Sequence, residues 1–385
     1  MKDQRNFYLL PRDRTEIHRG ATPLELMFDL AAVIAIAVAA SGLHHAVSEA
    51  HFTQGVLGFL FAFFMIWLAW MNYTWFASAY DNGSLWFQMI SMVIMFGALV
   101  LAAGIPAVFA VKPLYLGLIG FIIMRLGLVA LWLAAARGDP NHRSAAQRYA
   151  IGISAIQIYW IAIILLLPAT SDTLKWAFLL GFAGELAIPV FAERNRKTAW
   201  HRHHIIERYG LLNIIVLGEC FLAIVLALRA EGSGGIPPWH LLEIGLLASV
   251  ITFALWALYF SDDAHLSREE LTHVLIWGYG HFALFGAGAA TGAGFAVIVE
   301  YAEHHTQISE TAAALSVAIP VAIYVFTLWL VRDRYCVRGA TRFLMPASAL
   351  LVLAAGAYAS AQALPIIAAI LVITLLLRRI AGRTQ

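Results

Sequence analysis

Charge is scarce in this 385-residue chain. Only 12% of its residues are Asp, Glu, Lys or Arg, and 61% are hydrophobic, whereas a soluble globular domain carries about 25% charged residues. The composition therefore excludes a soluble globular protein. The formal net charge is +2 and the basic residues are confined to particular loops, so we expect no nucleic-acid partner.

Motifs of familiar enzyme chemistry are also missing. The sequence holds no phosphate-cradling loop, no Gly-x-Ser-x-Gly element and no nucleotide fingerprint, and we expect no cofactor. It has only two cysteines, Cys220 in a predicted span and Cys336 in a predicted cytoplasmic loop, so a disulfide is not expected. The charged N-terminus lacks a short apolar region with a cleavage site, which argues against a removable signal peptide.

Long apolar runs are what the chain does contain. Runs of roughly 18–27 residues are long enough to cross the hydrocarbon core of a bilayer as helices. The sequence therefore predicts an all-α, polytopic integral membrane protein with about twelve transmembrane helices. We place the spans at about 23–43, 53–78, 84–110, 113–136, 149–168, 173–192, 206–228, 239–261, 272–299, 310–331, 342–360 and 362–377.

The distribution of basic residues predicts the orientation. With the N-terminus inside, 21 Lys and Arg residues fall in inner loops and tails and three fall in outer loops. Since basic residues are retained on the cytoplasmic side, we expect both termini to be cytoplasmic.

The longest polar connection divides the spans into two sets of six. We expect an N-terminal segment (1–22), a first half (23–192), a linker (193–205), a second half (206–377) and a tail (378–385). Weak similarity links Glu25 to Glu207 and Trp70–Tyr73 to Trp256–Tyr259. Because six is even, the halves would be repeats of the same orientation, related by an axis along the membrane normal.

Two acidic stretches open the first and seventh spans. An uncompensated carboxylate within a bilayer costs at least ~2.5–3.5 kcal/mol, so these acids mark a candidate site. Glu25 and Glu207 begin their spans. At such a position an acid has a structural interpretation as well, because it can cap a helix start or face headgroup water. Asp29 lies one turn beyond Glu25 on the same face. Glu219 lies ~18 Å deeper than Glu207.

Three further ionisable residues fall at membrane depth in other spans. Arg125 stays charged and requires an acidic partner, a substrate anion or water. Glu219 and Asp29 are its candidate partners, and Glu185 is a third. His281 is either a proton carrier or a histidine satisfied by a neighbouring helix. These residues together predict either a polar cavity for a substrate or protons, or a buried ion pair that only fixes helix packing.

Two other patterns have structural as well as functional interpretations. Six glycines in the ninth span, between residues 278 and 294, fit either close helix packing or a broken helix beside a cavity. Short histidine groups occur at His44–His45, 201–204 and His304–His305. A metal site needs three or four converging ligands, and no intramembrane spacing supplies them, so we expect no metal site.

Three motifs resemble those of the low temperature requirement A (LtrA) family of bacterial membrane proteins. They are Thr22–Leu30, Trp67–Trp70 with Thr74–Phe76, and Glu207–Gly210 through Val216–Glu219. The resemblance extends from about His18 to the last spans. Met27, Ala31–Ala32 and Cys220 depart from the pattern, and these differences affect packing rather than the acids. The resemblance implies a location in the bacterial cytoplasmic (inner) membrane but no settled substrate or reaction.

Three functions remain open from the sequence. The first is a secondary transporter, in which Arg125 holds an anionic group while Glu219, Asp29 and His281 carry coupling protons. The second is an intramembrane enzyme acting on a lipid or lipid-linked substrate, and the third is a non-transporting scaffold or sensor. Expected partners are membrane lipids, an unknown small-molecule substrate and protons, whereas the oligomeric state is left open.

Overall fold

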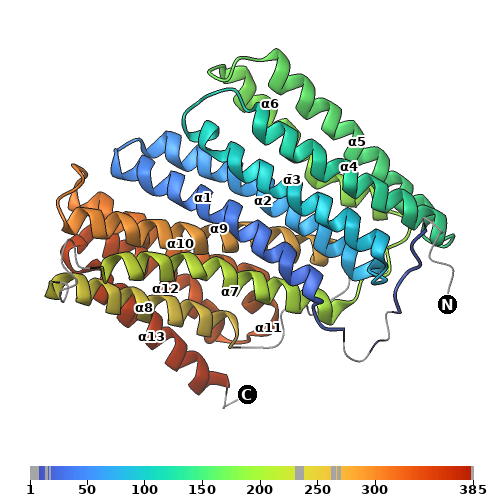
Figure 1. Cartoon of the computed structure of the whole chain (residues 1–385). Coiled ribbons are helices and arrows are strands. Elements are labelled where there is room, and N and C mark those ends of the chain that lie inside the picture. Colours follow the sequence, from blue (N-terminus) through green and yellow to red (C-terminus); the bar gives the residue numbers. More distant parts are fainter. Residues whose placement is uncertain are drawn as a thin grey trace. The chain divides into compact units, whose positions relative to one another are not determined.

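The structure is a computed structural model that describes residues 8–13, 16, 19–229, 238–261, 266 and 270–382. These residues form helices and connecting turns without any strand (Figure 1). Twelve of their helical segments are long and apolar enough to cross a membrane. The prediction of an all-helical, multi-pass membrane protein with about twelve spans is therefore confirmed.

The helices follow one another in chain order. They are α1 (Pro23–Ser48), α2 (Phe52–Tyr80), α3 (Leu85–Phe109), α4 (Tyr115–Gly138), α5 (Arg143–Leu166), α6 (Asp172–Glu193), α7 (Arg202–Ala227), α8 (Trp239–Tyr259), α9 (Leu271–Ala302), α10 (Glu310–Leu328), α12 (Leu344–Tyr358) and α13 (Ala363–Gly382). A π-helical turn (Trp329–Asp333) and α11 (Arg334–Cys336) extend the tenth span.

Local sequence explains where several helices begin. At α1 the Thr22 hydroxyl accepts a hydrogen bond from the Glu25 amide, and the Glu25 carboxylate accepts one from the Thr22 amide. This reciprocal arrangement is a capping box, and Pro23 occupies the first helical position, where its missing N–H costs nothing. Serine side chains cap α3, α6 and α10 at Ser84, Ser171 and Ser309.

The chain divides into two compact units. Unit 1 comprises Met1–Val38 and Phe64–Arg208, and unit 2 comprises Ala39–Phe63 and Tyr209–Gln385. The internal repeat between the two predicted six-helix halves is not confirmed and stays a prediction.

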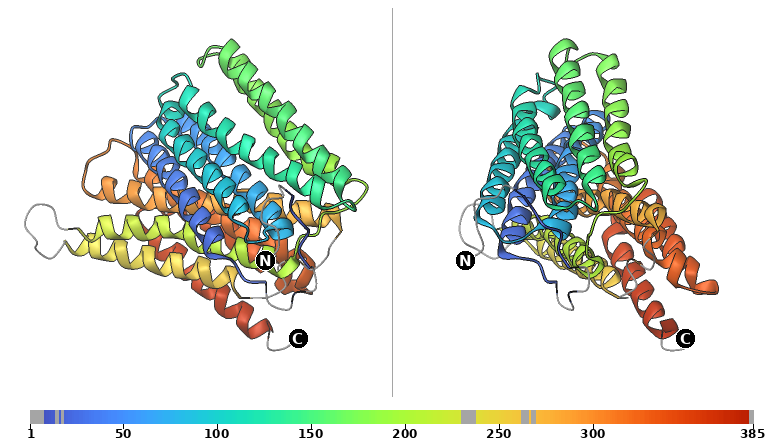
Figure 2. Two further views of the ribbon diagram at one scale, coloured as in Figure 1. Left: turned by 45° about the vertical axis from the view of Figure 1, so that its right-hand side comes forward. Right: turned by 90° about the vertical axis from the view of Figure 1, so that its right-hand side faces the viewer.

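In unit 1, α3 packs against α4, α4 against α5, and α5 against α6. Both views in Figure 2 show α5 and α6 side by side. Aromatic rings join α2, α4 and α5: Trp132 meets Phe76 edge to face at 4.8 Å between ring centroids and stacks on Tyr149 at 4.1 Å. This packing fixes the helices that carry the polar side chains described below.

Unit 2 is organised around α9, a continuous helix whose most apolar window is 83% buried. Helix α10 packs on α9, α12 packs on α10, and α13 lies along α8. A Cβ atom added at Gly294 would lie 2.2 Å from the Ser316 carbonyl oxygen. Since α9 is unbroken and its neighbour approaches this closely, the structure supports the packing interpretation of its glycines.

The end of the tenth span corrects one sequence prediction. We placed the end of this span at residue 331 and Cys336 in a loop, but the helix continues to Cys336. Arg332 is fully buried and donates hydrogen bonds to the carbonyls of Leu258 and Tyr259 at 3.1 and 2.6 Å. Its Nε donates to Asp333 at 2.8 Å. A guanidinium suits this position because the last carbonyls of α8 have no partner within their own helix.

Candidate functional site

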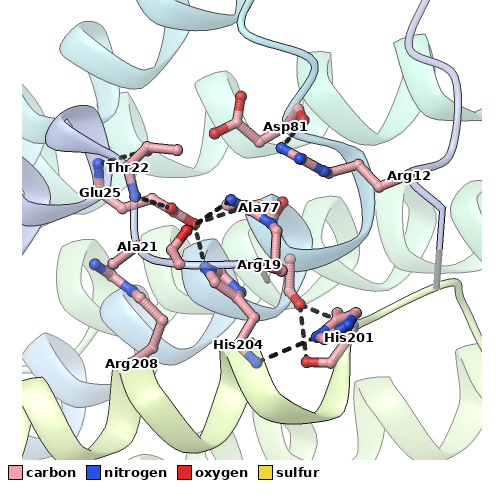
Figure 3. Close-up of polar contacts among 12 residues, drawn as sticks. Arg12, Arg19, Ala21, Thr22, Glu25, Ala77, Asp81, His201, His204 and Arg208 are labelled. Carbon is pink, nitrogen blue, oxygen red and sulfur yellow. Dashed lines mark hydrogen bonds and ion pairs between the residues drawn. The ribbon is translucent and has the colours of Figure 1, made fainter. Parts of the chain in front are cut away.

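The N-terminal end of α1 carries a fully buried carboxylate, Glu25 (Figure 3). Its Oε1 lies 3.0 Å from His204 Nε2 on α7 and 3.3 Å from Arg19 Nη2. Its Oε2 accepts the capping hydrogen bond from Thr22 at 2.8 Å. Both oxygens are therefore engaged, which offsets the cost of removing this charge from water.

Asp29, one turn further along α1, has a second set of partners in unit 1. Arg208 on α7 donates two parallel hydrogen bonds to its oxygens, at 2.8 and 2.7 Å. Trp70 on α2 donates a third, from Nε1 to Oδ1 at 2.7 Å. Asp29 and Arg208 are both 0% exposed. A bidentate arginine–carboxylate pair fixes orientation as well as charge, so α1, α2 and α7 are tied at one point.

The contacts of Glu25 and Asp29 repeat at the same spacing along α1 and α7. Glu25 and Asp29 are four residues apart on α1, and His204 and Arg208 are four residues apart on α7, so each pair shares one helix face. Glu25 meets His204 and Asp29 meets Arg208. We call these four residues the α1–α7 charge ladder. His204 is the one histidine among the four, and histidine is the side chain that ordinarily changes charge nearest neutral pH.

Two described arginines of the N-terminal segment, Arg12 and Arg19, contact the turn after α2 and the start of this ladder. Arg12 donates a hydrogen bond to the carbonyl of Asp81 at 3.0 Å (Figure 3). It also forms an ion pair with Glu16. Burial lowers the pKa of the Arg19 guanidinium, and the nearby Glu25 carboxylate opposes that shift. Burial raises the pKa of Asp81, while the hydrogen bond from the Gly83 amide opposes that shift.

Glu207 lies outside the ladder although it belongs to the same helix. Its carboxylate accepts a hydrogen bond from the Ala21 amide at 3.2 Å, and its side chain is exposed. Glu207 is the sixth residue of α7 and lies beyond its first turn, so it does not cap the start of its own helix. It holds the segment that leads into α1.

A second buried polar cluster lies near the middle of α4, α5 and α6 in unit 1. Arg125 Nη2 lies 2.8 Å from Glu185 Oε1, and Trp160 Nε1 donates to the same oxygen at 3.0 Å. The Arg125 guanidinium also stacks over the Phe121 ring, 4.4 Å from its centroid. Of the three acids considered as partners for Arg125, Glu185 is the one it pairs with, while Asp29 is held by Arg208.

This second cluster has hydrogen-bonding capacity left over. Several of its buried atoms have no hydrogen-bond partner among the described residues: Arg125 Nη1, Glu185 Oε2 and both polar atoms of the Gln157 side chain. Gln157 precedes Trp160 by three residues on α5, so the two share a helix face. We call Arg125, Gln157, Trp160 and Glu185 the mid-span cluster.

The two remaining candidates lie in unit 2. Glu219 on α7 is half-buried, and no hydrogen bond or ion pair joins its carboxylate to any residue in the described ranges. His281 on α9 is fully buried, with Nδ1 2.7 Å from the Trp277 carbonyl and Nε2 3.2 Å from the Tyr259 hydroxyl. Both ring nitrogens are engaged, as expected for the satisfied histidine.

Sequence reasoning missed three ionisable members of these networks. Arg19 and Arg208 were counted as inner-loop charges, and His204 was placed in a short histidine group outside the core. All three are buried. The spacing of His204 and Arg208, which equals that of Glu25 and Asp29, was the available signal.

Comparison with known proteins gives one match. The sequence profile of the family described as "Bacterial low temperature requirement A protein (LtrA)" matches residues 20–377, nearly the whole chain. No curated protein and no solved structure matches the chain. The matched region contains the charge ladder and the mid-span cluster, and it confirms the resemblance inferred from the three motifs.

Proposed function

Because this chain belongs to the bacterial low temperature requirement A protein (LtrA) family of multi-pass membrane proteins, we propose that it is a proton-coupled secondary transporter for a small anionic solute. The mid-span cluster is the observation that supports this proposal. Besides Arg125 Nη2, which forms the ion pair with Glu185, four of its atoms have no hydrogen-bond partner among the described residues, and they belong to side chains buried near the middle of three apolar helices.

A purely structural ion pair accounts poorly for this cluster. Each buried polar atom without a partner costs ~1–3 kcal/mol, and buried polar groups in proteins are normally satisfied. A solute with acceptor and donor atoms would fill this deficit, because Arg125 Nη1 offers a donor and Gln157 offers both a donor and an acceptor. Ionisable residues within membrane spans are typical of substrate and ion pathways.

The Arg125–Glu185 pair also supplies a way to couple protons to the solute. In the proposed cycle, Glu185 takes up one proton and loses the charge that holds Arg125. The released guanidinium then binds the anionic group of the solute. One proton and one negative charge enter together, so the net charge of the mid-span cluster is unchanged and the charges stay paired within the low-dielectric interior.

Glu219 is the second proton carrier in this proposal. Its half-buried carboxylate lies within α7 without a cation partner among the described residues, and a proton removes the cost of its charge in hydrocarbon. His281 is excluded from the proposed cycle because both of its ring nitrogens are already engaged.

The charge ladder has a different role in this scheme. Its carboxylates have hydrogen-bond or ion-pair partners at every oxygen. It joins α1 to α7, and the hydrogen bond from Trp70 adds α2. We assign it to positioning the N-terminal parts of α1 and α7, which agrees with the structural interpretation of buried ion pairs.

The proposed location is the bacterial cytoplasmic membrane, with both termini in the cytoplasm. The bias of Lys and Arg toward the predicted inner loops and tails supports this orientation. A C-terminal green fluorescent protein fusion should fluoresce, since this reporter matures in the cytoplasm, and a C-terminal alkaline phosphatase fusion should be inactive. The reverse pattern would contradict the orientation.

Proton flux in proteoliposomes tests the transport proposal. Liposomes loaded with a pH-sensitive dye would receive succinate, citrate, phosphate or sulfate outside, and wild type should acidify the lumen with at least one of these anions. Arg125→Gln should abolish this flux, and Glu219→Gln should reduce it. Glu207→Gln is the matched control, because that carboxylate is exposed and lies outside the mid-span cluster. Flux in Arg125→Gln equal to wild type would refute the proposal.

A further inference from the structure

The C-terminal ends of α1 and α9 bring three metal-binding side chains together in unit 2. His45 lies in the last turn of α1 and His44 directly precedes it, and Glu300 lies in the last turn of α9. One ligand atom from each lies within 4.8 Å of the other two. None of these residues belongs to the mid-span cluster or to the charge ladder, so the function proposed above does not use them.

The closest contact within this group joins its two less exposed members. His44 Nε2 lies 3.0 Å from Glu300 Oε1, so these two ligand atoms already face each other. Two ligand atoms bound tetrahedrally to one zinc ion at ~2.1 Å lie ~3.4 Å apart. The observed separation is close to this value, so a small side-chain rotation places both atoms on one cation.

His45 is the third candidate ligand, and its side chain is exposed. Its ring lies 4.9 Å from the His44 ring between centroids, whereas His44 is only 14% exposed. An exposed imidazole turns at low cost, because few packed neighbours hold it in one rotamer. His44 and Glu300 thus provide a partly fixed pair, and His45 closes on the ion.

The electrostatic setting of this site favours a cation. Carbonyl groups at a helix C-terminus carry a partial negative charge, which stabilises cations near the last turn. Helices α1 and α9 both end at this point of unit 2. The Glu300 carboxylate adds a full negative charge next to the two neutral ligands.

We propose that His44, His45 and Glu300 form a binding site for a borderline divalent transition metal, with Zn²⁺ and Co²⁺ as its simplest occupants. Two imidazoles and one carboxylate suit these ions, whereas Mg²⁺ and Ca²⁺ prefer ligand sets made of oxygen. Three protein ligands leave one position for water or an exchangeable ligand, as in open zinc sites.

Metal titration of the purified full chain tests this site. The protein would carry an affinity tag without histidine and would be stripped of metal with a chelator. Co²⁺ would then be added while its visible absorbance is recorded, and bound Co²⁺ would be displaced by Zn²⁺. Wild type should bind one equivalent saturably, with the intense absorbance of a four-coordinate ion. Absence of saturable binding by wild type would overturn the proposal.

Variants locate the bound ion. His45→Ala and Glu300→Gln should each weaken Co²⁺ binding by about tenfold or more, because each removes one of three ligands. His45 is exposed, so its removal leaves the packing of unit 2 intact, and size-exclusion profiles would verify folding. His305→Ala is the matched control, since His305 is exposed and pairs only loosely with Glu303 at 3.7 Å. Equal binding by His45→Ala and wild type, or an equal loss in the control, would contradict the assignment.

Discussion

Removing Arg208 tests the charge ladder most sharply, because this side chain holds Asp29 by two hydrogen bonds of 2.8 and 2.7 Å. Arg208→Met keeps a long apolar side chain but leaves the Asp29 carboxylate buried with Trp70 as its remaining donor. Breaking a buried ion pair by removing one partner costs ~3–5 kcal/mol. We expect a loss of this size in the free energy of unfolding.

The double variant separates the charge effect from the loss of packing. Asp29→Asn in the Arg208→Met background removes the stranded charge, and its amide oxygen still accepts the Trp70 hydrogen bond. Replacement of both charges in a buried pair is often nearly neutral, so the double variant should be clearly more stable than Arg208→Met alone.

Equilibrium unfolding in mixed micelles provides the assay, since the chain's 12 tryptophans give a strong fluorescence signal. Lys175→Met is the control, because Lys175 and Asp172 form an exposed ion pair with side chains 64% and 85% accessible. It should change stability by no resolvable amount. An unfolding free energy of Arg208→Met within ~1 kcal/mol of wild type, or a double variant no more stable than the single one, would contradict a stabilising role for the Asp29–Arg208 pair.

Two further predictions concern the pH dependence of stability in unit 1 and the packing of glycines in unit 2. Burial raises the pKa of Asp81, so wild type should lose stability as pH rises from ~3.9, the ordinary aspartate value, through the raised pKa. Asp81→Asn should remove this loss in melts across that range, and equal pH dependence in both proteins would be the contrary result. Gly294→Ala should destabilise by ~1–3 kcal/mol, because its Cβ would meet the Ser316 carbonyl at 2.2 Å. Gly218→Ala, with no atom within 4 Å of the added Cβ, should stabilise α7 by ~0.5–1 kcal/mol, and similar unfolding free energies for the two variants would argue against close packing at Gly294.

The helices were predictable because a bilayer imposes length and apolarity on every span, so hydropathy alone places them within a few residues. The prediction failed at the end of α10, where Arg332 looked like a loop charge. Its partners are the carbonyls of Leu258 and Tyr259 on α8. A contact between α8 and the end of α10 depends on helix packing, which a hydropathy pattern does not encode.

The buried acids were predictable from the sequence, but their basic partners were not. Glu25, Asp29 and Glu185 stand out against an apolar background, whereas Arg208 and His204 lie at a span end, where basic residues are ordinary. Pairing Arg125 with Glu185 rather than with Asp29 required the arrangement of α4, α5 and α6. Likewise the His44–His45 pair is plain in the sequence, but Glu300 joins it only through the packing of unit 2.

The most direct test of the account compares two transport modes of Glu185→Gln in proteoliposomes, with the anion that gives the largest proton flux in wild type. A permanently neutral side chain leaves Arg125 free to bind this anion but carries no proton. Glu185→Gln should therefore retain exchange of labelled anion between equal pools on both sides. It should lose accumulation driven by a pH gradient. Wild-type accumulation in this variant would contradict the central claim that protonation of Glu185 releases Arg125 for the solute.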